Sequence, residues 1–289
     1  MERMFKIVEK SKIWFSISLI IIIIGMATWL FKGLNLGIDF KGGTVVTIKI
    51  GKEFDVVELR KSLEKYDPQI DVREIEGYEV TIRSNKITTE QVNQIFNDVK
   101  TKYGLKDDAL RSIDTIGPSI GKELRRSAII STLLATLGIL IYTSFRFELW
   151  SGLAAIIALV HDLLVTISVY TILQIPVNSS FIAAMLTILG YSINDTIVVF
   201  DRIRENRKLG KYHDFETLAD ASITQTLARS INTVLTTLFT ITAIYIFGVP
   251  SIKEFALPLI IGIISGAYSS IFIASPLWVI FEKRQGQKV

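Results

Sequence analysis

The sequence contains no cysteine among its 289 residues and only two histidines. Without cysteine the chain can form neither a disulfide nor a thiolate metal site. Basic and acidic residues nearly balance, at 32 and 28, so the formal net charge is only +4. This excess falls in connections between apolar runs, which favours membrane orientation over nucleic-acid binding as its explanation. We therefore expect no nucleic-acid partner, no metal ion and no cofactor.

Charge is scarce in six long stretches of the chain. A helix needs roughly 20 apolar residues to cross the hydrocarbon layer of a membrane, and these stretches are long enough. They lie at residues 13–31, 127–145, 149–173, 179–200, 230–247 and 255–281. The four tryptophans stand near the ends of these runs, as expected for an aromatic belt. The sequence predicts a polytopic α-helical membrane protein with six transmembrane helices.

The charges of the connecting segments predict the orientation of these helices. Basic residues precede the first run and also occupy 145–148, 201–229 and the carboxyl-terminal tail. Connections 174–178 and 248–253 are nearly uncharged, so the positive-inside rule places both termini and 201–229 in the cytoplasm. The first run exceeds the roughly 7–15-residue apolar core of a signal peptide, so we expect it to be retained. The expected division is 1–32, an extracytoplasmic 33–126, and 127–289.

Segment 33–126 is charged and predicts a small folded domain between the first and second transmembrane helices. Its apolar periodicity gives the order strand, helix, strand, strand, helix, strand. That order is typical of a ferredoxin-like α+β domain. The segment shows no metal-ligand spacing, no nucleophile–base pair and no phosphate loop. An interaction domain is therefore predicted, and not an enzyme.

One acid, Asp195, lies inside the fourth apolar run. In a helix that begins near Ser179 it lies about 24 Å from the start. An ionisable group at membrane depth is costly, and it is usually turned inward with a functional role. Asp195 is therefore the first candidate for proton handling. The alternative is a structural acid held in a permanent ion pair or hydrogen-bond network.

Five motifs along the chain resemble those of the SecD/SecF family of protein-export membrane proteins. The longest and most specific closes the fourth run, Gly190-Tyr-Ser-Ile-Asn-Asp-Thr-Ile-Val-Val-Phe-Asp-Arg-Ile-Arg-Glu-Asn206. The others are Gly37-Ile-Asp-Phe-Lys-Gly-Gly-Thr44, Ile116-Gly-Pro-Ser-Ile-Gly121, Ala158-Leu-Val-His-Asp162 and Leu227-Ala-Arg-Ser-Ile-Asn-Thr-Val-Leu-Thr-Thr237.

The resemblance implies half of an RND-type permease that is completed by SecD. It implies that the chain works beside the SecYEG channel and uses the proton-motive force to draw translocating polypeptide across the cell membrane. It also implies that Asp195 and Arg229 form a proton pathway. Arginine stays protonated, so Arg229 would control the charge of Asp195 and not carry protons itself. From its place at a span edge alone, Arg229 is equally an interfacial arginine that reaches lipid headgroups.

Three further features keep two interpretations each. His161 and Asp162, near the middle of the third run, form either a second relay or a locally satisfied pair that fixes helix packing. The pair Gly262 and Gly266 either permits close approach of another helix, such as one of SecD, or occurs by chance. A polar stripe on the fifth run either lines a water path or bonds to neighbouring helices; it comprises Ser230, Asn232, Thr233, Thr236 and Thr237.

Two other functions compete with a role in protein export. The first is one half of an RND-type antiporter that exchanges small molecules for protons. Drug exporters of that type carry two half-repeats and two large outside domains in one chain, whereas this chain has one half and a small domain. The second is a structural subunit of the translocon. A scaffold does not need Asp195 in the membrane, so neutral replacement of that residue separates it from the other two functions.

Overall fold

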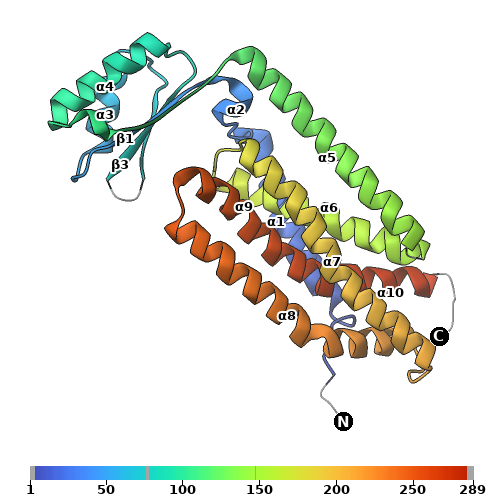
Figure 1. The fold of residues 1–289 in the computed structure, drawn as a ribbon. Coiled ribbons are helices and arrows are strands. Elements are labelled where there is room, and N and C mark those ends of the chain that lie inside the picture. Colours follow the sequence, from blue (N-terminus) through green and yellow to red (C-terminus); the bar gives the residue numbers. More distant parts are fainter. Residues whose placement is uncertain (1–3, 76–77, 147, 285–289) are drawn as a thin grey trace. The chain divides into compact units, whose positions relative to one another are not determined.

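The computed structural model describes residues 4–75, 78–146 and 148–284, which form two compact units. One unit is a helical bundle that combines the chain up to Asn35 with the chain from Ile130 onward, and the other is Leu36–Ile129. Among the described residues, six helical segments are long and apolar enough to cross a membrane. They are α1 (Ser11–Lys32), α5 (Pro118–Arg146), α6 (Leu149–Ile172), α7 (Ser179–Leu209), α8 (Phe215–Phe247), and α9 (Pro250–Ser269) with its continuation, η2 (Ser270–Ala274) and α10 (Ser275–Arg284) (Figure 1).

The centre of the bundle is formed by α6, α7 and α9, with α7 running alongside both α8 and α9 (Figure 1). In α6 and in α7, half of the most apolar stretch is buried, and in the last span 61% is buried. The buried share of the corresponding stretch is 11% in α1 and in α8, and none of it is buried in α5. The outer helices therefore leave most of their apolar side chains exposed. At one end, the fully buried ring of Trp278 packs against Phe200 and Phe215, with ring centroids 4.8 and 5.4 Å away.

Glycines set the close contact between α7 and α9. A Cβ on Gly262 would lie 2.2 Å from Ile188, and one on Gly266 would lie 3.0 Å from Ser192. Small residues allow such approach in membranes, where packing and not the hydrophobic effect holds helices together. The Gly262–Gly266 pair thus permits a close contact with α7 within this chain, and this contact accounts for the pattern without a helix of SecD.

The predicted loop 201–229 is largely helical, which corrects the sequence-based expectation. Helix α7 continues to Leu209, and α8 is one helix of 33 residues that begins at Phe215. Gly210 ends α7 in the left-handed conformation at φ 60°, and Asp214 caps α8 through the Thr217 amide. With 31 residues α7 is about 46 Å long, which exceeds a hydrocarbon layer of about 30 Å. Both helices therefore project beyond the hydrocarbon layer.

The sixth span is also not one continuous α-helix. Its expected range was 255–281, but α9 already begins at Pro250 and gives way at Ser270–Ala274 to a π-helical turn. Proline is favoured in a first helical turn, where its missing N–H costs nothing. The Ser275 hydroxyl donates to the Ser270 carbonyl across the π turn at 3.0 Å.

The second unit, Leu36–Ile129, contains a four-stranded antiparallel sheet. Its elements after the short α2 (Ile38–Lys41) are β1 (Gly43–Lys49), α3 (Val56–Leu63), β2 (Asp71–Ile75), β3 (Glu79–Ser84), α4 (Thr89–Tyr103), η1 (Asp107–Ala109) and β4 (Leu110–Ile116). The sheet order is β2-β3-β1-β4, and the element order is the one predicted from periodicity. Alternate residues of β1 and β3, such as Ile48 and Ile82, meet Leu59 of α3 and Ile95 of α4 in a buried core.

The two glycine motifs of this unit meet each other. Gly43 has φ 136°, a conformation that side chains rarely adopt, and a Cβ there would lie 2.6 Å from the Ser84 carbonyl oxygen. A Cβ on Gly121 would lie 3.1 Å from the amide nitrogen of Gly42. Glycine is therefore required for the backbone to pass this closely. The sequence revealed the glycines but not that the two motifs contact each other.

Candidate functional site

Asp195 lies on the side of α7 that faces α8 and is 8% exposed. Within the described part of the chain, its Oδ2 atom and the Oγ atom of Ser230 on α8 are both buried without a hydrogen-bond partner. The Ser230 hydroxyl and the Arg229 guanidinium are near enough to act on the carboxyl group. The geometry of a hydrogen bond with Ser230 is nevertheless not met. The carboxyl group of Asp195 is thus left with unused hydrogen-bonding capacity, which is unusual for a buried polar group.

A small cavity between α7 and α8 contains both predicted pathway residues. Its volume is about 80 Å³, and its wall includes Asp195, Asn194, Arg229 and Thr233. A single water needs only about 10–15 Å³ of such space, so the cavity can hold more than one. Arg229 is an exposed residue of α8, and no ion pair within 4.0 Å joins it to Asp195 among the described residues. The structure therefore brings the two residues together at one cavity without a direct salt bridge.

The polar stripe on α8 divides between two environments. The Tyr191 hydroxyl of α7 lies 2.9 Å from the Thr237 hydroxyl and donates to the Thr233 carbonyl at 3.2 Å. Asn232 and Thr236 are exposed on the outside of the bundle instead. The hydroxyl of Thr236 donates to the Asn232 carbonyl one turn earlier, which satisfies it within the helix. One part of the stripe thus bonds to α7, and the other part is a polar surface on a membrane-spanning helix.

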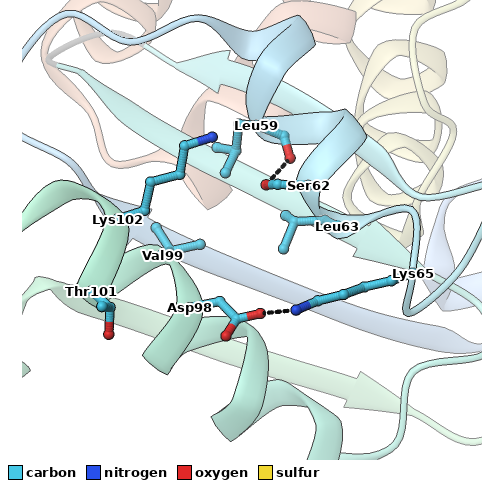
Figure 2. A pocket seen from close by; sticks show the side chains of 8 residues that line it. All are labelled: Leu59, Ser62, Leu63, Lys65, Asp98, Val99, Thr101 and Lys102. Atoms are coloured by element: carbon cyan, nitrogen blue, oxygen red, sulfur yellow. Dashed lines mark hydrogen bonds and ion pairs between the residues drawn. The ribbon is translucent and has the colours of Figure 1, made fainter.

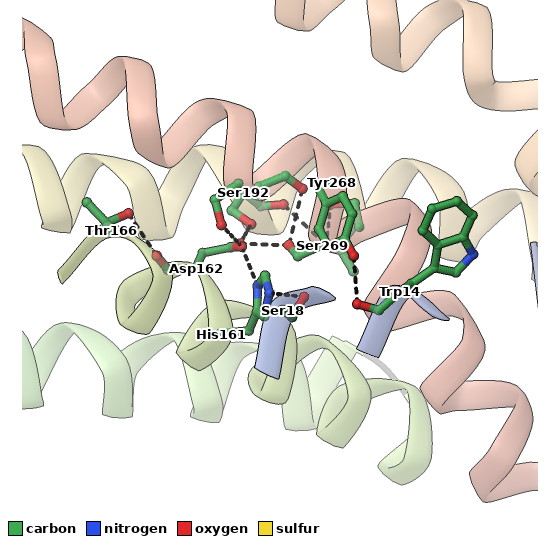
Figure 3. A network of polar contacts seen from close by, with 12 residues as sticks. Trp14, Ser18, His161, Asp162, Thr166, Ser192, Tyr268 and Ser269 are labelled. Carbon is green, nitrogen blue, oxygen red and sulfur yellow. Dashed lines mark hydrogen bonds and ion pairs between the residues drawn. The ribbon is translucent and has the colours of Figure 1, made fainter. Parts of the chain in front are cut away.

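Asp162 and His161 on α6 lie in a separate polar network (Figure 3). Asp162 is fully buried, and three serine hydroxyls donate to its carboxylate, from Ser192 at 2.6 Å and from Ser265 and Ser269 at 2.8 Å each. His161 Nδ1 lies 3.0 Å from Asp162, and its Nε2 lies 2.8 Å from Ser18 of α1. The network thus joins four helices. Sequence reasoning found the His-Asp pair but missed the serines, although Ser265 and Ser269 stand four residues apart on one helix face.

A third buried carboxylate, Asp220 of α8, was not predicted. Its Oδ1 accepts hydrogen bonds from the backbone amides of Ile7 and Val8, both at 3.0 Å. These bonds hold the segment before α1 against the beginning of α8. The described residues contain no group of three or more His, Cys, Asp or Glu side chains that could hold a metal ion.

The Leu36–Ile129 unit carries a groove of about 320 Å³ between α3 and α4 (Figure 2). Leu59, Leu63 and Val99 line it, and an ion pair between Lys65 and Asp98 at 2.6 Å lies across it. The hydrogen bond from Lys65, with a second from Tyr66, holds the pKa of Asp98 below its ordinary value. The groove contains no arrangement of nucleophile and base.

Comparisons with known proteins support the resemblance seen in the motifs. Residues 95–284 match the family described as "Protein export membrane protein SecD/SecF, C-terminal", and residues 28–53 match the "SecD/SecF GG Motif". The chain is 38% identical to the protein translocase subunit SecF of Acidaminococcus fermentans, over 97% of this chain and 98% of that protein. It is 35% identical to the protein translocase subunit SecDF of Bacillus subtilis, over 97% of this chain and 38% of that protein.

A solved structure gives the same result. The crystal structure of SecDF from Thermus thermophilus, described as a translocon-associated membrane protein, matches with a TM-score of 0.89 at 34% identity. The match covers 98% of this chain and 39% of that one. The chain thus corresponds to nearly all of one relative and to about two fifths of each SecDF chain.

Proposed function

The chain belongs to the SecD/SecF family of protein export membrane proteins, and from this premise we propose that it is an accessory subunit of the Sec translocase. In this proposal it forms a complex with SecD beside SecYEG and uses the proton-motive force to promote the export of polypeptides. The observation that carries the proposal is the α7–α8 cavity, where Asp195 has a buried oxygen without a hydrogen-bond partner and Arg229 supplies a positive charge.

Proton binding at Asp195 would change the forces between α7 and α8. An ionised Asp195 is attracted to Arg229, and that attraction is lost when the carboxyl group takes up a proton. The Oδ2 atom can accept a proton without first giving up a hydrogen bond. Only 11% of the most apolar stretch of α8 is buried, so a change in the attraction to α7 can shift that stretch without disrupting the centre of the bundle. Asp195 is the proton carrier in this mechanism, and Arg229 responds to its charge.

SecD is the proposed source of the missing half of the permease. The exposed part of the α8 stripe, with Arg229, Asn232 and Thr236, is poorly suited to contact lipid. The chain also matches only about two fifths of SecDF relatives, whose names join both parts in one protein. We therefore propose that transmembrane helices of SecD cover this side of α8.

The proposed orientation follows the charge of the connecting segments. The chain spans a cell membrane with both termini, the carboxyl end of α7 and the beginning of α8 in the cytoplasm, and with the α+β domain outside. That domain, 33–126 in the expected division, is proposed to be ferredoxin-like and to contact translocating polypeptide. Its sheet order β2-β3-β1-β4 supports the first part of this proposal.

The test is export of a secreted precursor in cells that carry Asp195→Asn, with and without an uncoupler that removes the proton-motive force. The expected result is that the wild-type chain shows a component of export that the uncoupler abolishes, and that Asp195→Asn lacks this component at an equal amount of protein in the membrane. Full uncoupler-sensitive export by Asp195→Asn would favour a structural subunit. Proton transport that depends on an added small molecule, together with export that Asp195→Asn leaves unchanged, would favour the small-molecule antiporter.

A further inference from the structure

We propose that Asp162 is a positioning residue that fixes the α7 segment bearing Asp195, and that it does not carry protons. The inference rests on the proposed function, since Asp195 is the group that is positioned. It chooses between the two interpretations that the sequence left open for His161 and Asp162.

The hydrogen bonds at Asp162 occupy the sites where a proton would bind. An ionised carboxylate has about four acceptor sites, and four donors occupy them here. Oδ1 receives Ser265 and His161, and Oδ2 receives Ser192 and Ser269. An ionised Asp162 only accepts, so in that state a neutral His161 carries its proton on Nδ1, and its Nε2 accepts from Ser18. Proton uptake at Asp162 would therefore reverse or break an existing hydrogen bond, whereas at Asp195 it would not.

The network holds four helices together around this carboxylate. Its members come from α1, α6, α7 and α9, and among the described hydrogen bonds none links it to α5 or α8. Among the described residues, the further titratable group that contacts the network is Tyr268, whose ring stacks on His161 with centroids 6.0 Å apart. Its hydroxyl donates to the Trp14 carbonyl and so ties α9 to α1 a second time. The network thus connects four helices, and α8 is not one of them.

Asp195 lies beside the residues through which α7 is hydrogen-bonded to α6 and α9. Ser192, which donates to Asp162, is three residues before Asp195 and so about one turn away. The next residue, Thr196, lies 2.8 Å from the Ser270 hydroxyl of the π turn. Gly266 allows α9 to approach Ser192 closely at the same level. One face of α7 is therefore fixed to α9, and Asp195, on the adjoining face, is held toward α8 and Arg229.

The proposal separates hydrogen bonding from titration, and asparagine tests that difference. An asparagine oxygen can accept from two donors, and its NH2 group can donate to two serine hydroxyls, which act in either role. Asp162→Asn can thus keep the network but cannot carry a proton, whereas Asp162→Ala loses the network. Ser18→Ala removes the hydrogen bond between His161 and α1, and Ser16→Ala is its matched control, because the Ser16 hydroxyl donates within α1, to the Lys12 carbonyl.

The experiment measures uncoupler-sensitive and uncoupler-insensitive export in cells, and the melting temperature of each purified full-length variant. We expect Asp162→Asn to retain uncoupler-sensitive export within about twofold of wild type and to melt near wild type. Asp162→Ala should melt at a lower temperature than wild type. Its uncoupler-sensitive export should fall at least tenfold, while its uncoupler-insensitive export should stay at the wild-type level. Ser18→Ala should melt lower than Ser16→Ala.

Three results would overturn the proposal. The first is loss of uncoupler-sensitive export in Asp162→Asn equal to that in Asp195→Asn, which would make Asp162 a proton carrier. The second is a proportional loss of both components in Asp162→Ala, which would leave only a general structural role. The third is wild-type behaviour of Asp162→Ala. Failure of the proposed function looks different, because export would then be insensitive to Asp195→Asn while the melting temperatures would still report on the network.

Discussion

Removing the charges of Asp195 and Arg229 one at a time and together gives a quantitative test of the α7–α8 cavity. Two unit charges 4 Å apart attract by about 4 kcal/mol at an effective dielectric constant of 20, and the attraction falls with distance. The two residues share one cavity without an ion pair within 4.0 Å, and Arg229 is exposed. The expected coupling is therefore about 1–3 kcal/mol, which corresponds to a 5–150-fold departure from additivity.

The assay is a double-mutant cycle on the uncoupler-sensitive component of export, with equal amounts of protein confirmed in membranes. Asp195→Asn and Arg229→Ala should each abolish most of this component, and the double mutant should be no worse than the more defective single mutant. Arg229→Lys keeps the charge and should recover part of the loss. Thr236→Val, on the exposed side of α8, serves as the control partner and should combine additively with Asp195→Asn.

Losses for Asp195 and Arg229 that add within about 0.5 kcal/mol would refute the reasoning, because uncoupled residues behave in this way. Such a result would mean that the cavity holds two groups with separate purposes. A coupling above about 4 kcal/mol would also contradict it, since the structure shows no direct ion pair that could supply so much.

Three other predictions concern the orientation and the α+β unit. A cysteine at Ser112 should react with an impermeant thiol reagent from outside intact cells and one at Lys208 should not; both side chains are exposed, and reversed labelling would contradict the orientation. Gly43→Ala should destabilise the α+β unit by about 1–3 kcal/mol, measured as faster amide hydrogen exchange in the β-strands, whereas Gly117→Ala, with open space around its Cα, should not. Burial raises the pKa of Asp67, but hydrogen bonds and a nearby lysine outweigh burial and hold the net pKa below its ordinary value. The stability it provides is therefore present above pH about 4 and is lost as the pH falls through its folded pKa, so amide protection around Asp67 should drop on acidification, and Asp67→Asn should lack that drop.

Much of the fold follows from one-dimensional patterns. Apolar run length identified the spanning helices, because the hydrocarbon layer requires roughly 20 residues whatever their neighbours are. Periodicity likewise gave the order of strands and helices in the α+β unit, and turn residues marked its boundaries. The extension of α7 and α8 into 201–229 was missed because charge was taken to end a helix. Charge ends only the membrane-embedded part, and buried Ile203 and Leu218 continue the helical packing beyond it.

Some residues of the candidate site could be predicted from the sequence and others could not. Asp195 stands out in the sequence because an acid in an apolar run is rare, and Arg229 was reached only through the resemblance. The serines that surround Asp162 carry no such signal, since serine is common in membrane helices. Their importance comes from three helices meeting at one point, which no local pattern contains. Both carboxylate oxygens of Asp162 have hydrogen-bond partners, whereas Oδ2 of Asp195 has none among the described residues. Only the three-dimensional structure reveals this difference.

The π turn at Ser270–Ala274 has a consequence for the angular phase of the last span. A turn closed by i→i+5 bonds contains one residue more than an α-helical turn, so it offsets the side chains after it by about 100° from a continuous helix. The offset lets Ser269 face Asp162 while Trp278, nine positions later, fills the aromatic cluster with Phe200. Deleting one residue from the turn would restore the α-helical count and make these two contacts mutually exclusive. The number of residues between the serine and the tryptophan is therefore as constrained as their identity.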